Sequence, residues 1–270
     1  PRKFQYFARF EWPRISNPML RFPIDDQVIA EVEVKEAQAI AEIKDALKRN
    51  PDDIAGLIIE PIQGEGGDNH FRGEFLQALR DLADEAEFLL IFDEVQTGFG
   101  TTGKWWCFEH FDLQPDLFAF GKKAQICGIC GSERLDEVES VFEVSSRINS
   151  TWGGNLADMI RCQRYVEIIE TENLLHNATT VGEHLLNGLR GLEEEYPGRV
   201  TNARGRGMFV AVDLPDGETR NQLLRTMRQA DVLGLASGER AIRFRPNLAL
   251  TIEEADIGLD RLRRALAVNL

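Results

Sequence analysis

The chain has 270 residues, and its 31 Lys and Arg residues against 45 Asp and Glu residues leave a formal net charge of −14. Its hydrophobic fraction of 43% and charged fraction of 28% are typical of a folded globular protein that needs no disulfide or metal to complete its core. The acidic balance argues against binding to nucleic acid or to anionic lipid. Four cysteines are too few for a secreted disulfide framework, so we expect a cytoplasmic protein.

The first 24 residues are rich in Pro, Arg and aromatic side chains without a period, which predicts an irregular segment. The chain opens on Pro-Arg-Lys-Phe rather than on Met, and we expect that an amino-terminal portion of the protein precedes it. Apolar residues then recur at helical spacing over residues 25–49. The Asn-Pro pair at 50–51 predicts the end of that helix.

Three short apolar segments follow, at 54–59, 88–92 and 117–120. Nearly uninterrupted apolar strands are expected in a parallel sheet that is covered on both faces. Between the first two segments, apolar residues at helical spacing predict a helix over 73–85. A strand, a helix and a strand in this order indicate a right-handed βαβ unit.

The remainder of the chain predicts a second domain of α+β type. Helices are expected at 155–171, 181–195, 219–230 and 252–266, and strands at 208–212 and 241–244. A nucleotide-binding oxidoreductase would need a Gly-x-Gly-x-x-Gly turn between a strand and a helix, and the sequence has none.

An ionisable residue follows each of the three apolar strands of the first domain. These residues are Glu60, Asp93 and Lys122. Ligands of open α/β sheets bind beyond the carboxyl ends of the strands, where these side chains should meet. A lysine that can hold an aldehyde covalently, beside a carboxylate that can keep a pyridine nitrogen protonated, is suited to pyridoxal phosphate chemistry.

Four motifs in order strengthen this interpretation: Glu-Pro-Ile-Gln-Gly-Glu-Gly-Gly at 60–67, Phe-Asp-Glu-Val-Gln-Thr-Gly at 92–98, Phe-Gly-Lys-Lys at 120–123 and Ser-Thr-Trp-Gly-Gly-Asn at 150–155. Together they resemble the class III aminotransferases over essentially the whole chain. The resemblance implies an α/β fold of the aspartate-aminotransferase type (fold type I), with a mainly parallel sheet truncated at its amino-terminal side. It also implies a large cofactor-binding domain over 1–158 and a small α+β domain over 159–270.

The resemblance implies the cofactor pyridoxal 5′-phosphate and a role for each matching residue. Lys122 would hold the cofactor and move the proton during catalysis. Asp93 would pair with the pyridine nitrogen, Val95 would pack on the ring, and Gln96 would bond the ring hydroxyl. Thr151 would reach the cofactor phosphate of a neighbouring subunit, which makes a homodimer with a shared active site the smallest functional unit.

Glu65 and Arg243 match the pair that selects substrates in this family. Arg243 would bind a carboxylate of 2-oxoglutarate, and Glu65 would mask it when the substrate has no such group. The motifs resemble most the subgroup that moves the terminal amine of L-lysine to 2-oxoglutarate, giving 2-aminoadipate 6-semialdehyde and glutamate. A 4-aminobutyrate or ornithine enzyme of the same class, or a catalytically incompetent fragment, stays an alternative.

We expect structural roles for the remaining polar residues near these motifs. Glu94 should order its loop, and Lys123 and Arg245 should be structural. Cys127 and Cys130 have metal-binding spacing, but no second Cys or His pair lies at a matching distance in sequence, so no metal site is expected.

Overall fold

The computed structural model describes residues 5–141, 143–147, 151 and 153–269. Residues 5–24 have no regular structure beyond a turn and bends, as their composition predicts. Helix α1 (Asp26–Arg49) begins where Asp25 accepts a hydrogen bond from the backbone of Val28 at 2.7 Å, and it ends at Asn50, just before Pro51. The helix predicted over 25–49 is therefore confirmed.

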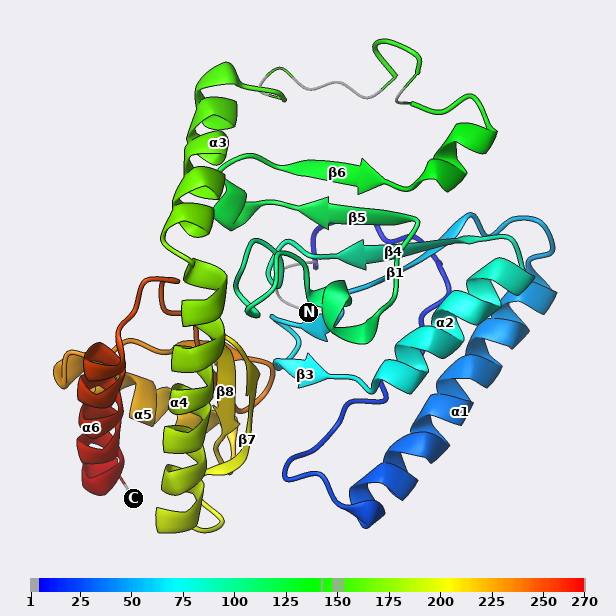
Figure 1. Ribbon diagram of the computed structural model, residues 1–270. Helices are drawn as coiled ribbons and strands as arrows, with labels where there is room; N and C mark the ends of the chain where they lie inside the picture. Colours follow the sequence, from blue (N-terminus) through cyan, green and yellow to red (C-terminus); the bar gives the residue numbers. More distant parts are fainter. Residues whose placement is uncertain (1–4, 142, 148–150, 152, 270) are drawn as a thin grey trace.

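The first sheet has the strand order β1-β4-β5-β6 (Figure 1). Strands β1 (Gly56–Ile59), β4 (Leu89–Asp93) and β5 (Leu117–Phe120) are parallel, which confirms the three predicted strands within two residues, and β6 (Gly128–Gly131) runs antiparallel to β5. Helix α2 (Gly73–Glu85) connects β1 to β4 through the short β2 (Ile62–Gln63) and β3 (Asn69–His70) ladder.

Only one face of this sheet is fully covered within the described part of the chain. Leu90 and Phe92 of β4 are buried against α1 and α2, whereas alternate residues of β1 and β4 are less buried and Ile58 of β1 is 67% exposed. The prediction of cover on both faces is therefore not met here, because the described elements that pack on the sheet gather on one side. β1 also leaves an exposed outer edge, as the expected truncation predicts.

The second sheet is antiparallel, with the order β7-β8-β10-β9. Helices α3 and α4 lead to it, and α4 lies across β7 and β8 (Figure 1). Leucine, valine and methionine side chains of α4, α5, α6 and this sheet form its own core. The bounds are α3 (Leu156–Thr171), α4 (Leu174–Glu195), β7 (Thr201–Arg206), β8 (Phe209–Asp213), α5 (Gly217–Gln229), β9 (Leu235–Ser237), β10 (Ala241–Phe244) and α6 (Ile252–Asn269).

All four helices and both strands expected in this half are present. Helix α4 begins seven residues before the predicted start, and β7 and β9 are strands that the sequence analysis missed. The domain division after residue 158 stays a prediction; α3 begins two residues before it. No helix among the described residues is long and apolar enough to cross a membrane.

Candidate active site

The carboxyl ends of β1, β4 and β5 bring Glu60, Asp93 and Lys122 to one edge of the sheet. Burial is the main factor that raises the pKa of Glu60; the charge of Asp93 raises it further, while Lys122 and Arg243 lower it. Asp93, Lys122 and Arg243 therefore each lie within electrostatic range of Glu60. The residues at the strand ends therefore lie near one another around Glu60, as expected, and Arg243 reaches the same place from β10 of the second sheet.

Lys122 begins a short 3-10 turn (Lys122–Ala124) directly after β5 and Gly121. Its φ of +52° lies in the left-handed region, which costs a non-glycine residue about 1 kcal/mol or more. The backbone N–H of Gln125 donates to the Lys122 carbonyl at 3.0 Å and closes the turn. Lys122 is exposed at this turn.

The adjacent Lys123 points into a different environment. Its Nζ donates to the backbone carbonyl of Gln96 at 2.5 Å, so it ties the turn after β5 to the loop after β4. Burial, and then the charge of Lys122, lower the pKa of Lys123 to about 8, while Glu94 opposes the shift. This tether agrees with the structural role expected for Lys123.

Asp93 and Glu94 are adjacent in sequence at the end of β4, but their carboxylates have different surroundings. Asp93 Oδ1 accepts a hydrogen bond from the Val95 N–H at 3.0 Å and remains half-buried at the strand end. Glu94 is buried, accepts from the Phe108 N–H at 2.9 Å and from the Thr97 hydroxyl, and has a pKa raised by burial. Glu94 therefore orders the loop, which leaves Asp93 as the carboxylate that faces the site.

Glu65 and Arg243 form an ion pair although 178 residues separate them. Their atoms Oε2 and Nη2 lie 2.9 Å apart, and Arg243 Nη1 donates to Gln96 Oε1 at 3.2 Å. The Arg243 side chain is 12% exposed, whereas that of Glu65 is 55% exposed. The arginine is thus enclosed and its carboxylate partner faces solvent.

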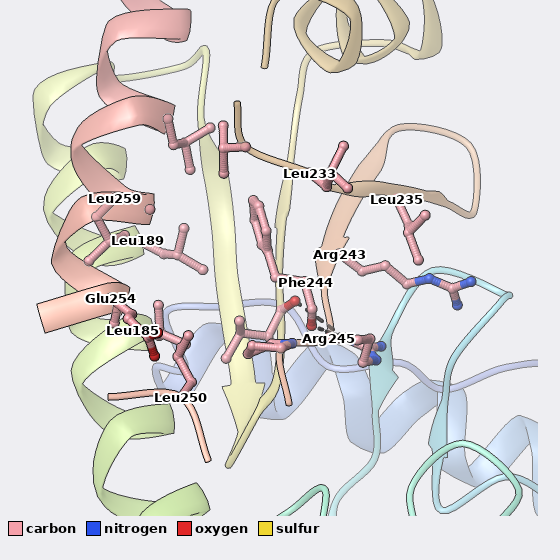
Figure 2. Close-up of a pocket in the computed structure, with 16 residues that line it drawn as sticks. Leu185, Leu189, Leu233, Leu235, Arg243, Phe244, Arg245, Leu250, Glu254 and Leu259 are labelled. Atoms are coloured by element: carbon pink, nitrogen blue, oxygen red, sulfur yellow. Dashed lines mark hydrogen bonds between the residues drawn. The ribbon is translucent and has the colours of Figure 1, made fainter. Parts of the chain in front are cut away.

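An apolar cavity of about 410 Å³ lies beside the second sheet, and Arg243 of β10 is one of the residues that line it. Side chains of a strand alternate between its faces, so Ile242 and Phe244 pack with the helices while Arg243 points the other way. Figure 2 shows the Arg243 guanidinium extending away from the leucines of α4 and α6. Arg243 therefore borders both the cavity, as one of its lining residues, and the charged site, through its ion pair with Glu65.

Two buried arginines that contact the loop after β2 were not assigned this contact from sequence. Arg204 of β7 is 2% exposed and donates to the carbonyls of Gly67 at 2.6 Å and Asp68 at 2.9 Å. Arg245 is ion-paired with the buried Asp68 and lies over the ring of Phe209, which suits the structural role expected for it. Arg204 carries no signal in sequence, because β7 is polar and has no apolar alternation.

Thr151 lies exposed in the loop before α3, and its neighbours in the motif, Ser150 and Trp152, lie outside the described residues. Its predicted contact is with another subunit, so this role stays a prediction. Among the described residues, no cluster of three or more His, Cys, Asp or Glu side chains could hold a metal ion.

Comparison with known proteins identifies the family. The family model of the class III aminotransferases matches residues 6–266. The chain belongs to the class III aminotransferases. This membership confirms the resemblance seen in the motifs and makes pyridoxal 5′-phosphate the cofactor.

The most informative relatives are enzymes named for lysine. The L-lysine-epsilon aminotransferase of Amycolatopsis lactamdurans is 49% identical over 269 residues, which cover 99% of this chain and 60% of that protein. The one from Mycobacterium tuberculosis strain H37Rv is 46% identical over 97% of this chain and 58% of its own length. The human mitochondrial 4-aminobutyrate aminotransferase is 35% identical over 96% of this chain. The chain thus spans about three fifths of the length of the lysine relatives.

Solved structures confirm the expected fold. The lysine aminotransferase of M. tuberculosis superposes with a TM-score of 0.94 at 45% identity, covering 98% of this chain and 61% of that one. An omega-transaminase from Thermomicrobium roseum gives a TM-score of 0.78 at 26% identity over 88% of this chain. The aspartate-aminotransferase-type fold is therefore established for this class III aminotransferase.

The residues at the strand ends fit the cofactor chemically. A carboxylate (Asp93), an amide (Gln96) and an amine (Lys122) are the donor set that a pyridine nitrogen, a ring hydroxyl and an aldehyde require. Glu60 and Asp93 each accept one backbone hydrogen bond, from Gly64 at 2.8 Å and from Val95 at 3.0 Å, whereas the buried Glu94 is held by its own loop.

Proposed function

We propose that the full-length protein transfers the terminal amine of L-lysine to 2-oxoglutarate, giving 2-aminoadipate 6-semialdehyde and glutamate. The ion pair between Glu65 and Arg243 carries this proposal, because Arg243 can either be paired with Glu65 or be available to a substrate carboxylate. With Arg243 masked, the site accepts the uncharged methylene chain next to the reacting amine of lysine. With Arg243 released, it binds the carboxylate that 2-oxoglutarate carries next to its reacting carbonyl carbon. The identity of 46–49% to relatives named for lysine supports the same donor.

Each site residue has a defined task in this proposal. When bound, pyridoxal phosphate supplies an electron sink for the substrate carbon that bears the amine. Lys122 Nζ takes the proton from that carbon and returns one at the end of the transfer. Asp93 keeps a proton on the pyridine nitrogen by its negative charge, and Arg243 grips the acceptor carboxylate bidentately.

The functional unit in this proposal is a homodimer with a shared site, to which Thr151 of the second subunit contributes. Its location in the cytoplasm stays a prediction that rests on the low cysteine content. The division into a large domain over 1–158 and a small domain over 159–270 belongs to the same proposal.

A donor series tests the substrate assignment in the full-length protein. L-lysine, L-ornithine and 4-aminobutyrate are each offered with 2-oxoglutarate, and glutamate and the aldehyde product are measured by mass spectrometry. We expect kcat/KM for lysine to exceed that for ornithine, one methylene shorter, by about tenfold or more. A preference for ornithine or 4-aminobutyrate would reject lysine as the donor, and transfer from none of the three would reject the activity.

The Arg243→Ala variant tests the carboxylate site directly. Losing a charge-assisted bidentate contact should raise KM for 2-oxoglutarate by about 30-fold while the amine-donating half-reaction with lysine stays within about threefold. Arg190→Ala, an exposed arginine of α4, is the matched control and should change neither. An equal loss in both half-reactions would show that Arg243 is structural.

A further inference from the structure

The loop that carries Glu65 is held almost entirely by the second domain. This loop, the 64–68 loop, consists of Gly64, Glu65, Gly66, Gly67 and Asp68. Four of its five carbonyls accept hydrogen bonds from the second sheet or its turns: Gly64 from Ser237 Oγ at 2.7 Å, Glu65 from the Gly238 N–H at 3.0 Å, and Gly67 and Asp68 from Arg204 at 2.6 and 2.9 Å. The Gly66 carbonyl accepts from Asn69 within the loop region at 3.2 Å.

The backbone of the loop also approaches its neighbours closely at two glycines. A Cβ on Gly64 would meet the Gln96 side chain at 2.6 Å, on the side of the first domain. A Cβ on Gly238 would meet Gly66 O and Gly67 Cα at 2.9 Å, on the side of the second domain, and Gly238 also has a φ of +51°. The loop is therefore clamped between the turn after β4 and the turn after β9.

The same hairpin that clamps the loop also carries Arg243. Strands β9 and β10 pair antiparallel, with Ser237 opposite Ala241 and Leu235 opposite Arg243. Ser237 and Gly238 thus set the position of the Glu65 backbone, while β10 sets the position of its ionic partner. One rigid hairpin fixes the separation between the two ends of the ion pair.

Within this clamp, Glu65 and Gly66 are exposed, and Glu65 is the one of the two with a side chain that can rotate. It is 55% exposed, whereas Arg243 is 12% exposed, Ser237 is 2% exposed and Arg204 is 2% exposed. A ligand carboxylate that competes for Arg243 can displace the Glu65 carboxylate by rotation of its side chain, without breaking any of the four backbone bonds.

We propose that Ser237, Gly238 and Arg204 are positioning residues that hold the 64–68 loop rigid, so that the choice between substrates is made by the Glu65 side chain alone. This inference rests on the proposed function of the Glu65–Arg243 pair. It assigns part of the substrate discrimination to the β9–β10 hairpin and β7, none of which carries a group that reacts.

The test uses Ser237→Ala in the full-length protein. The Gly64 carbonyl keeps the N–H groups of Gly67 and Asp68 as partners, at 3.3 and 3.1 Å, so the fold should survive. Without the Ser237 bond the loop should loosen, and the masking of Arg243 should weaken. We expect the ratio of kcat/KM for lysine to kcat/KM for glutamate, each as amine donor, to fall about fivefold. Arg204→Lys keeps the positive charge beside Asp213 but removes the planar guanidinium group that bonds the two loop carbonyls. It should also lower the lysine-to-glutamate ratio.

Val212→Ala is the matched control, because Val212 is buried in the same sheet but packs in the core of the second domain. It should lower stability and leave the ratio unchanged. Hydrogen exchange of the peptide over 62–70 is a second readout that needs no turnover. Faster exchange in Ser237→Ala but not in Val212→Ala supports the anchoring of the loop. Equal exchange in the two variants overturns the proposal. An unchanged ratio of kcat/KM for lysine to that for glutamate, despite faster exchange, overturns it as well. If the wild-type protein transfers no amine from lysine, the proposed function fails, and the exchange result still decides the anchoring.

Discussion

Lys122 and Lys123 are adjacent in sequence but have different environments. Lys122 is exposed at the strand end in a left-handed conformation, and Lys123 is tied to the Gln96 carbonyl with a pKa of about 8. A lysine with a lowered pKa is the better nucleophile, yet the one in this pair is occupied by a hydrogen bond and faces the loop interior. Position, rather than acidity alone, therefore favours Lys122 as the residue that holds the cofactor.

Reductive labelling distinguishes the two lysines. Pyridoxal phosphate is added to the protein, reduced with borohydride, and the modified residue is located by mass spectrometry. We expect a phosphopyridoxyl group on Lys122 and none on Lys123. Lys123→Arg should retain the label and Lys122→Arg should lose it. Labelling of Lys123 in the wild-type protein would contradict the assignment.

The buried His70 makes stability depend on pH. Burial, reinforced by Arg204 and Arg206, lowers its pKa to about 3 from an ordinary value of 6.5. Between these values the unfolded chain binds a proton at this residue and the folded chain does not. Stability should therefore fall as pH decreases below 6.5, by up to about 1.4 kcal/mol per pH unit from this group. Urea unfolding at pH 7 and pH 5.5 should show a smaller loss for His70→Leu than for the wild type. The exposed His176→Gln should lose as much as the wild type; an equal loss in His70→Leu would refute the argument.

Besides its core side chains, helix α4 has a glycine at its contact with the turn between β7 and β8. A Cβ on Gly182 of α4 would lie 2.2 Å from the backbone of Gly207, in the turn between β7 and β8. Gly207 in turn packs against the backbone of Thr102, and the Met208 N–H donates to the Thr101 carbonyl at 2.8 Å. Three backbone segments are thus stacked, and this stack seats the second domain against the loop that follows β4.

Two glycines of the same helix give opposite predictions. Gly182→Ala should lower the free energy of unfolding by about 2 kcal/mol, because the helix must move away from the turn. A Cβ atom on Gly191 would have no other atom within 4 Å. Gly191→Ala should therefore raise the free energy of unfolding by about 0.5–1 kcal/mol, because alanine has the higher helix propensity. Urea denaturation of both variants measures the difference. Equal effects of the two substitutions would mean that the close contact carries no energy.

At the scale of the whole molecule, the site belongs to both sheets. Asp93 and Lys122 come from the first sheet, Arg243 comes from β10 of the second, and Glu65 lies on a loop clamped between them. Because the 64–68 loop and Arg243 are both held by the second sheet, movement of one sheet relative to the other would change their distance from Asp93 and Lys122. Thr151 is exposed before α3, and its contribution to the site of a further subunit stays a prediction.

A subunit-mixing experiment tests the shared site. Thr151→Asp should repel the cofactor phosphate and Lys122→Ala removes the catalytic amine, so each variant alone should be inactive. In a random mixture, half of the dimers are hybrids, and one of the two sites in each hybrid has both residues intact. We expect about a quarter of the wild-type activity to return. A mixture that stays inactive, although exchange of subunits is demonstrated, would place Thr151 in its own subunit's site.

By itself, the sequence determined the strand-end residues, the family and most of the elements. Continuous apolar strands and amphipathic helices are local patterns, and the four motifs are read without knowing how the chain folds. The helix over 73–85 and the strands at 117–120 and 241–244 have the predicted bounds because apolar periodicity and flanking turn residues agree there. β7 and β9 escaped prediction because one is polar and the other is three residues long.

Only the tertiary structure decided what holds the site in place. Arg204 and Ser237 bind the backbone of a loop that lies more than 130 residues away in sequence. This contact depends on how the two sheets dock, so no local sequence pattern predicts it. The pairing of Glu65 with Arg243 was inferred from resemblance, but its burial asymmetry, with the arginine enclosed and the carboxylate exposed, required the fold. The physical reason is that backbone carbonyls accept hydrogen bonds whatever their side chain, so the anchoring leaves no trace in the residues that are anchored.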